Sequence, residues 1–140
     1  CRPMKLLRSR RQSRGAAAVE FAVVAPVFFL VVLGIIEFGR MIMVQQVLTN
    51  AAREGARIAV RDSATTARVN TRVNDYLSSA NLSGASITIT PNPPNTAGFD
   101  QPVTVRVDVP FAAVSALSRP FLAGSTTLTA QSVMRREPVE

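Results

Sequence analysis

Residues 16–36 read AAAVEFAVVAPVFFLVVLGII, a run of 21 residues in which Glu20 is the single charged side chain. As an α-helix with a rise of 1.5 Å per residue, the run is about 31 Å long, close to the thickness of a bilayer hydrocarbon core. The 140-residue chain has only about 100 residues beyond it, too few to bury such a helix on every side. The run therefore predicts a transmembrane helix.

A removable signal peptide is the alternative interpretation, because a basic segment precedes the run. A signal peptide has an apolar region of about 7–15 residues and ends at a cleavage site of the A-x-A type. Here the apolar run is longer and is followed by EFGRMIMVQQ, so we expect it to stay attached. The basic residues place the N-terminus in the cytoplasm and the residues beyond about 40 outside it.

The positive charge of the chain is concentrated at its N-terminus. The net charge is +7, and six of the 16 Lys and Arg residues lie in the first 14 positions: Arg2, Lys5, Arg8, Arg10, Arg11 and Arg14. The remaining 126 residues hold ten Arg against nine acidic residues, a net charge of +1. A nearly neutral body lacks the basic surface of a nucleic-acid-binding protein, so we expect no nucleic-acid partner.

The helical pattern continues after the run, without a proline, through Asp62. Apolar and small residues follow at spacings of three and four, which predicts one helix from about 16 to 61 with a stripe formed by Phe38, Met41, Ile42, Leu48, Ala52, Gly55 and Ala59. Glu37 with Arg40, and Glu54 with Arg57, have the i,i+3 spacing of ion pairs on an exposed helix.

Two features of this helix are candidates for packing against another helix. Pro26 removes a backbone hydrogen bond, which a membrane helix tolerates either alone or beside a neighbouring helix. The second is a cluster of small residues that allows close approach of another backbone: Ala52, Gly55, Ala56 and Ala59. The alternative for this cluster, which we prefer, is that the chain's own sheet covers it.

The rest of the chain predicts a second helix and three strands. The helix lies within residues 63–84, with Thr65 or Thr66 as its cap and an end at Asn81 and Gly84. Strict alternation marks strands in SITIT (86–90) and PVTVRVDVPF (102–111), and STTLTAQSVMRRE (125–137) is the last strand. The fold class is α+β: a long N-terminal transmembrane helix, a second amphipathic helix and a small antiparallel sheet. We divide the chain into a basic leader (1–15), a transmembrane helix (16–36), its continuation (37–62) and an α+β ectodomain (63–140).

Residues suited to catalysis are scarce. The chain has no His, its single Cys is Cys1, and no Gly-rich phosphate loop is present. The acidic residues of the ectodomain show no paired spacing: Asp62, Asp75, Asp100 and Asp108. We therefore expect neither an enzyme nor a metal or cofactor site.

The position of Glu20, a charged residue within the apolar run, requires an explanation. A cut between Gly15 and Ala16 would create an α-amino group one helical turn before the Glu20 carboxylate. A carboxylate in hydrocarbon costs several kcal/mol unless it is paired, and the amine of the same or of an adjacent subunit could pair with it. The alternative is a glutamate that reaches the headgroups and needs no partner.

Gly15, the residues AAAV, then Glu20 and Phe21 behind a basic leader resemble the processing signature of type IV prepilins. The segments AAVEFA, GIIEFGR and AAREGAR, in that order over about residues 11–61, are similar to the TadE-like family of the tight-adherence (Tad/Flp) pilus system. The resemblance implies a minor pilin or pseudopilin that a prepilin peptidase cuts after Gly15, with a processing motif of Gly15, Ala16, Glu20 and Phe21.

The same resemblance implies the cellular setting. The protein would lie in the bacterial inner membrane, in contact with lipid, and its partners would be other pilins and the Tad secretion machinery, in pilus assembly, secretion or adhesion. Major Flp pilins are much shorter and usually have Tyr after the Glu, so this chain is not expected to be the bulk filament subunit. The alternative function is an uncleaved single-pass anchor whose ectodomain acts as an envelope adaptor or scaffold.

Overall fold

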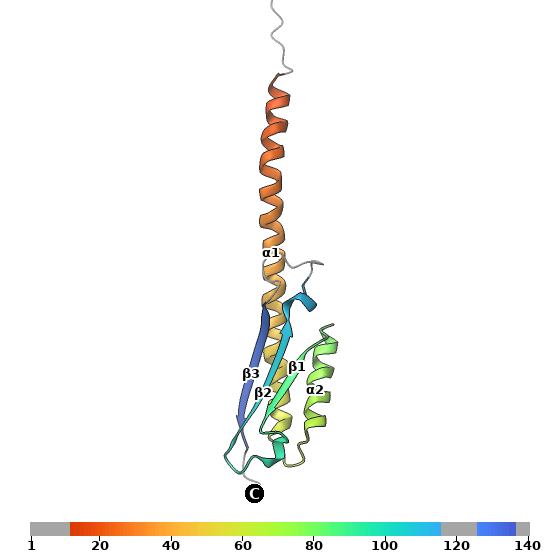
Figure 1. The fold of residues 1–140 in the computed structure, drawn as a ribbon, viewed down its shortest axis with the longest axis vertical. Helices are drawn as coiled ribbons and strands as arrows, with labels where there is room; N and C mark the ends of the chain where they lie inside the picture. Colours follow the sequence, from red (N-terminus) through yellow and green to blue (C-terminus); the bar gives the residue numbers. More distant parts are fainter. Residues whose placement is uncertain (1–11, 116–125, 137–140) are drawn as a thin grey trace, which may run out of the picture. The chain divides into compact units, whose positions relative to one another are not determined.

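The computed structural model describes residues 12–115 and 126–136 (Figure 1). The chain forms two compact units, residues 1–35 and residues 36–140, and helix α1 (Gln12–Ala59) contributes to both. Parts of three predicted segments lie outside the described residues. They are most of the basic leader, the end of the final strand segment at Glu137, and part of the connection after Phe111.

The first unit consists of the N-terminal part of α1. The side chains of its large apolar residues are exposed, among them Phe21, Phe28, Phe29 and Leu30. In the described part of the chain, α1 is the one helix long and apolar enough to cross a membrane, with a mean hydropathy of 2.7 over its most apolar window. Pro26 lies inside α1, which remains helical on both sides of it (Figure 1).

The second unit contains the rest of α1, helix α2 (Thr66–Ser79) and three strands, β1 (Ser86–Thr90), β2 (Pro102–Pro110) and β3 (Thr127–Arg135). The strands form one antiparallel sheet in the order β1-β2-β3. The predicted α+β fold, with a long apolar helix, a second helix and three antiparallel strands, is therefore confirmed.

Thr65 caps the start of α2. Its Oγ1 accepts a hydrogen bond from the backbone N–H of Arg68 at 3.3 Å, which satisfies one of the free donors of the first turn. Beyond the C-terminal end of α2, Asn81 and Gly84 have positive φ angles of 55° and 76°. These residue types adopt such angles readily, which explains why the helix ends in this part of the sequence.

The core of the second unit lies between the sheet and the two helices. Alternation along β2 places four valines on the inner face, all fully buried: Val103, Val105, Val107 and Val109. The inner face of α1 and the apolar face of α2 meet them with Leu48, Ala52, Ala56, Val69 and Val73. The amphipathic patterns of strand and helix are thus satisfied within one chain.

The predicted apolar stripe of α1 was wrong at its beginning. Phe38 and Ile42 are 61% and 45% exposed, whereas Glu37 is only 1% exposed. The buried face runs instead through Glu37, Val44, Leu48 and Gly55. A period of 3.6 residues fits both faces here, and only the position of the domain decides between them.

Arg136 joins three segments at the far end of β3. One of its guanidinium nitrogens, Nη1, donates to the backbone oxygens of Asn95 and Ala97, at 3.0 and 2.9 Å. The other, Nη2, pairs with Asp62 Oδ1 at 2.7 Å. Through these contacts the loop before β2, which the sequence marks as rich in turns, is attached to the α1–α2 connection.

Gly55 offers a direct test of the packing between α1, α2 and β2. A Cβ at this position would lie 2.6 Å from Val73 Cγ2 and 3.1 Å from Val105 Cγ1. We expect Gly55→Ala to lower the free energy of unfolding by about 1–3 kcal/mol, because overpacking forces neighbouring side chains to shift. Thermal and chemical unfolding of the full chain in detergent micelles, followed by circular dichroism, measures this loss.

Gly39→Ala is the matched control, since a Cβ at Gly39 meets nothing within 4 Å. Alanine in a helix is favoured over glycine by roughly 0.5–1 kcal/mol, so this variant should be as stable as the wild type or more so. Equal stability of the two alanine variants would contradict a tight contact at Gly55.

Candidate functional site

The four residues of the predicted processing motif lie on the first turns of α1 and are exposed. Gly15, Ala16, Glu20 and Phe21 all lie in the helical segment that begins at Gln12. Among the described residues, Glu20 has neither a hydrogen bond nor an ion pair. The motif is thus accessible, and the described residues provide no partner for its carboxylate.

A shallow apolar hollow follows the motif on the same unit. Phe21, Val24, Ala25, Phe28 and Phe29 line it, and the rings of Phe28 and Phe29 meet edge to face with centroids 5.9 Å apart. The exposed Pro26 lies in this part of the helix. A surface of this kind suits lipid chains or the apolar side chains of another helix.

The small residues proposed as packing candidates are buried in the core of the second unit. Ala52, Ala56 and Ala59 are almost completely inaccessible, and Gly55 faces Val69 and Val73 of α2 and Val105 of β2. The sheet and α2 of the same chain therefore cover this face of the helix.

The GIIEFGR segment holds the connection that follows β2. Ser115 Oγ donates a hydrogen bond to Glu37 Oε1, and Arg40 Nε donates to the backbone oxygen of Val114 at 3.0 Å. The second carboxylate oxygen of Glu37, Oε2, is buried and has no hydrogen-bond partner among the described residues. Both charged side chains thus point toward the domain, and the structure shows no ion pair between them in the described part of the chain.

Sequence reasoning missed the role of Glu37 because a charged residue was assigned to the solvent-exposed face. Glu37, Val44 and Ala51 do recur at intervals of seven residues, or two helical turns, but the same period also fits the face of Phe38 and Ile42, so the spacing alone could not decide between them.

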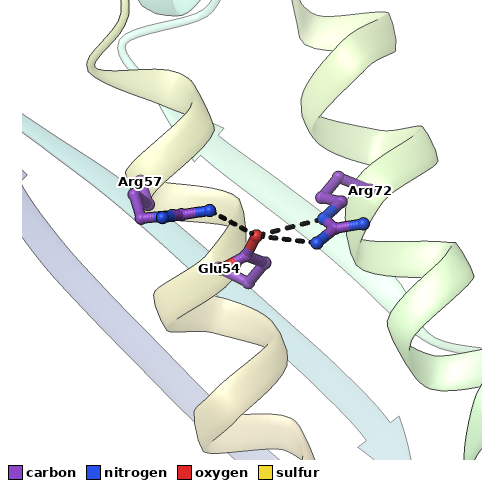
Figure 2. Close-up of polar contacts among 3 residues, drawn as sticks. All are labelled: Glu54, Arg57 and Arg72. Carbon is purple, nitrogen blue, oxygen red and sulfur yellow. Dashed lines mark hydrogen bonds and ion pairs between the residues drawn. The ribbon is translucent and has the colours of Figure 1, made fainter.

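The AAREGAR segment carries an ion-pair cluster that joins the two helices (Figure 2). Glu54 Oε1 accepts hydrogen bonds from Arg57 Nη2 at 3.2 Å, from Arg72 Nε at 3.1 Å and from Arg72 Nη2 at 3.0 Å. The predicted pair of Glu54 with Arg57 is present. Arg72, on α2, could not be assigned from the sequence because it lies 18 residues away.

The pKa of Glu54 is lowered, chiefly by the hydrogen bond from the Arg72 side chain and further by the positive charge of Arg57. Partial burial of the carboxylate acts in the opposite direction and does not outweigh the two guanidinium groups. Glu54 is therefore a structural anion that holds α2 against α1.

Three further acidic residues of the domain form ion pairs with arginines. Asp62 pairs with Arg136, Asp100 with Arg135 at 3.1 Å, and Asp108 with Arg106 at 2.9 Å. Within the described residues, no group of three or more metal-ligating side chains occurs. The polar contacts on the domain can thus be explained as contacts that hold its elements together.

The described part of the chain contains an exposed, apolar helical segment and a small α+β unit. The class of protein is therefore one with a candidate membrane anchor and a small α+β domain. Residues 15–57 match the family model described as TadE-like protein, which confirms the resemblance noted in the sequence. The match begins at Gly15 of the processing motif and ends at Arg57 of the ion-pair cluster. Comparisons with curated proteins and with solved structures gave no match.

The ion-pair cluster leads to a pH-dependent prediction. Because the pKa of Glu54 is lower in the folded state, its contribution to stability is complete above its ordinary value of 4.5 and is lost as the pH falls through the lowered pKa. Glu54→Gln should reduce the free energy of unfolding by about 0.5–1 kcal/mol at pH 7, since partly exposed pairs contribute little. The difference from the wild type should shrink toward zero in strongly acidic solution.

Unfolding of the full chain in micelles at several pH values measures this difference. Asp75→Asn is the matched control on α2, because the structure shows no ion pair for Asp75 in the described part of the chain. A stability difference for Glu54→Gln that does not change with pH would contradict the assigned role.

Proposed function

We propose that this protein is a TadE-like minor pilin or pseudopilin, a membrane-anchored component of Tad/Flp pilus assembly or secretion. In this proposal residues 1–15 form a cytoplasmic leader, residues 16–36 span the bacterial inner membrane and the α+β domain lies outside. The observation that carries the proposal is the TadE-like match over residues 15–57, which contains both the processing motif and the candidate span.

The environment of Glu20 supports a role in assembly. Its side chain is exposed on the apolar part of α1, and the described residues offer it no partner. An unpaired carboxylate in hydrocarbon is costly, so membrane insertion creates a demand for a positive group. The α-amino group that cleavage would create at Ala16, on this subunit or on a neighbour, meets that demand.

The position of Gly15 is consistent with processing at this bond. The bond between Gly15 and Ala16 lies within α1, so a peptidase must unwind the helix around it. Glycine destabilises a helix by about 0.5–1 kcal/mol relative to alanine. Gly15 therefore lowers the cost of exposing the bond.

The second candidate function is an uncleaved membrane anchor with an adaptor or scaffold domain. The observation in its favour is that Arg40 and Glu54 have hydrogen-bond partners within the domain, without a second subunit. The two functions differ in the N-terminus of the protein in the cell.

We expect the N-terminus of the protein isolated from membranes to be Ala16, as determined by mass spectrometry. Gly15→Val should prevent processing, because a branched side chain crowds the peptidase subsite, and the protein should retain its leader. Gly39→Val, the same substitution in a more distant part of α1, should leave processing unchanged. An intact leader on the wild-type protein would favour the anchor and exclude cleavage.

Glu20→Gln should insert into the membrane as the wild type does but enter the pilus or its assembly complex poorly, because a neutral amide cannot pair with an amine. Glu20→Asp, which keeps the charge, should retain part of this function. Immunoblots of sheared surface fractions and of crosslinked membranes measure the incorporation. Incorporation of the glutamine variant at the wild-type level would contradict the pairing.

A further inference from the structure

Four large apolar side chains are exposed on α1 at the beginning of the second unit. Ile36, Phe38, Ile42 and Met43 are 52%, 61%, 45% and 54% exposed, and we call them the collar surface. They follow the candidate span directly in the sequence, in a stretch that the sequence assigns to the aqueous side because Glu37 and Arg40 occur in it.

The two charges of this stretch do not belong to the collar surface. Glu37 is 1% exposed and accepts the hydrogen bond from Ser115, and the partly buried Arg40 donates to the carbonyl of Val114. At 3.6 residues per turn, Glu37 lies on the face of α1 that carries Val44 and Leu48 into the core. These contacts hold the two charged side chains against the domain, so the charges do not interrupt the exposed apolar face after the apolar run.

The exposed face of α1 becomes polar soon after Met43. Gln46, Asn50 and Arg53 are exposed on the turns that follow, while Gln45 bonds to the Thr129 carbonyl oxygen of β3 at 2.8 Å. From Ile36 to Met43 the helix rises by about 10 Å. On the exposed face of α1, the change from apolar to polar side chains therefore lies about two helical turns later than the sequence alone indicates.

We infer that the collar surface is a lipid-binding surface, immersed in the interfacial region of the bilayer on the side of the α+β domain. The inference rests on the proposed function, in which the preceding residues span the membrane. A bilayer is about 30 Å thick in its hydrocarbon core and about 40–45 Å with both polar regions, which leaves about 5–7 Å for each polar region. Helical side chains lean toward the N-terminus of their helix, here toward the core, so those of the two turns after the span reach the interfacial region.

The chemistry of the surface favours lipid over a protein partner. Protein interfaces combine an apolar centre with about one hydrogen bond per 100–200 Å², and such bonds fix the position of the partner. The collar surface contains no polar side chain, and the charged groups of the same turns, Glu37 and Arg40, bond to Ser115 and Val114. Lipid chains require no directional contact, so a purely apolar surface next to a span is sufficient for them.

The consequence concerns the anchoring of the domain. Glu37 and Arg40 attach the segment at Val114 and Ser115 to the same two turns of α1 that carry the collar surface. The domain is then held at the membrane surface by its own helix. A protein extracted from the membrane into an assembly must cover the collar surface as well as the span.

Tryptophan fluorescence tests this surface, because the chain has no Trp and each variant carries a single probe. We would reconstitute the full chain into vesicles of phosphatidylethanolamine and phosphatidylglycerol, without or with phosphatidylcholine that is brominated either near the carbonyl end or near the methyl end of its chains. The variants are Phe38→Trp and Ile42→Trp on the collar surface, Phe28→Trp in the span and Asn50→Trp on the polar turns of α1.

The expected result is a blue-shifted emission for Phe38→Trp and Ile42→Trp, with a loss of intensity in brominated vesicles closer to that of Phe28→Trp than to that of Asn50→Trp. If Phe28→Trp is quenched while both collar variants behave as Asn50→Trp does, the inference is overturned and the membrane anchor stands. Blue-shifted collar variants that are not quenched would show a protein covering, such as a second copy, and would also overturn it. Absence of quenching in Phe28→Trp would instead overturn the membrane span of the proposed function.

Discussion

The close approach of α1 to α2 and β2 at Gly55 is the constraint on which the fold of the domain depends. With a Cβ at this position only 2.6 Å from Val73, no larger residue fits without a shift of its neighbours. Alanines at positions 52, 56 and 59 continue the same shallow face, and the valines of β2 pack against it. The part of α1 that follows the candidate membrane span is therefore also the central element of the core, and it cannot be removed without exposing the sheet.

Polar contacts then fix the positions of the elements that pack around Gly55. Glu54 reaches Arg72 on α2, Gln45 reaches the Thr129 carbonyl on β3, and Arg40 reaches the Val114 carbonyl after β2. Such bonds contribute about 1 kcal/mol or less each, whereas burial of a single valine contributes roughly 1.5–3 kcal/mol. Apolar burial accounts for most of the stability, and the directional contacts select one arrangement of the elements along α1.

The sequence was most informative where a pattern is local. The apolar run, the strict alternation of β2 and the Thr65 cap depend on neighbouring residues, and all three agree with the structure. The inward position of Glu37 and the bond from Arg72 to Glu54 depend on residues far away in the chain, so periodicity alone could not assign them. The processing motif rests on family resemblance, and its cleavage depends on an encounter with a peptidase rather than on the fold.

Three glutamates along α1 have three different environments in the described structure. Glu54 is held as an anion by two arginines, and Glu37 is buried with a hydrogen bond from Ser115. Glu20 is exposed on an apolar helix, where the described residues provide neither a cation nor a donor. A carboxylate requires such a partner in a medium of low dielectric constant, so Glu54 has its partners within the chain, whereas Glu20 would depend on another group there. Assembly with another molecule is therefore expected to depend on the N-terminal end of the helix.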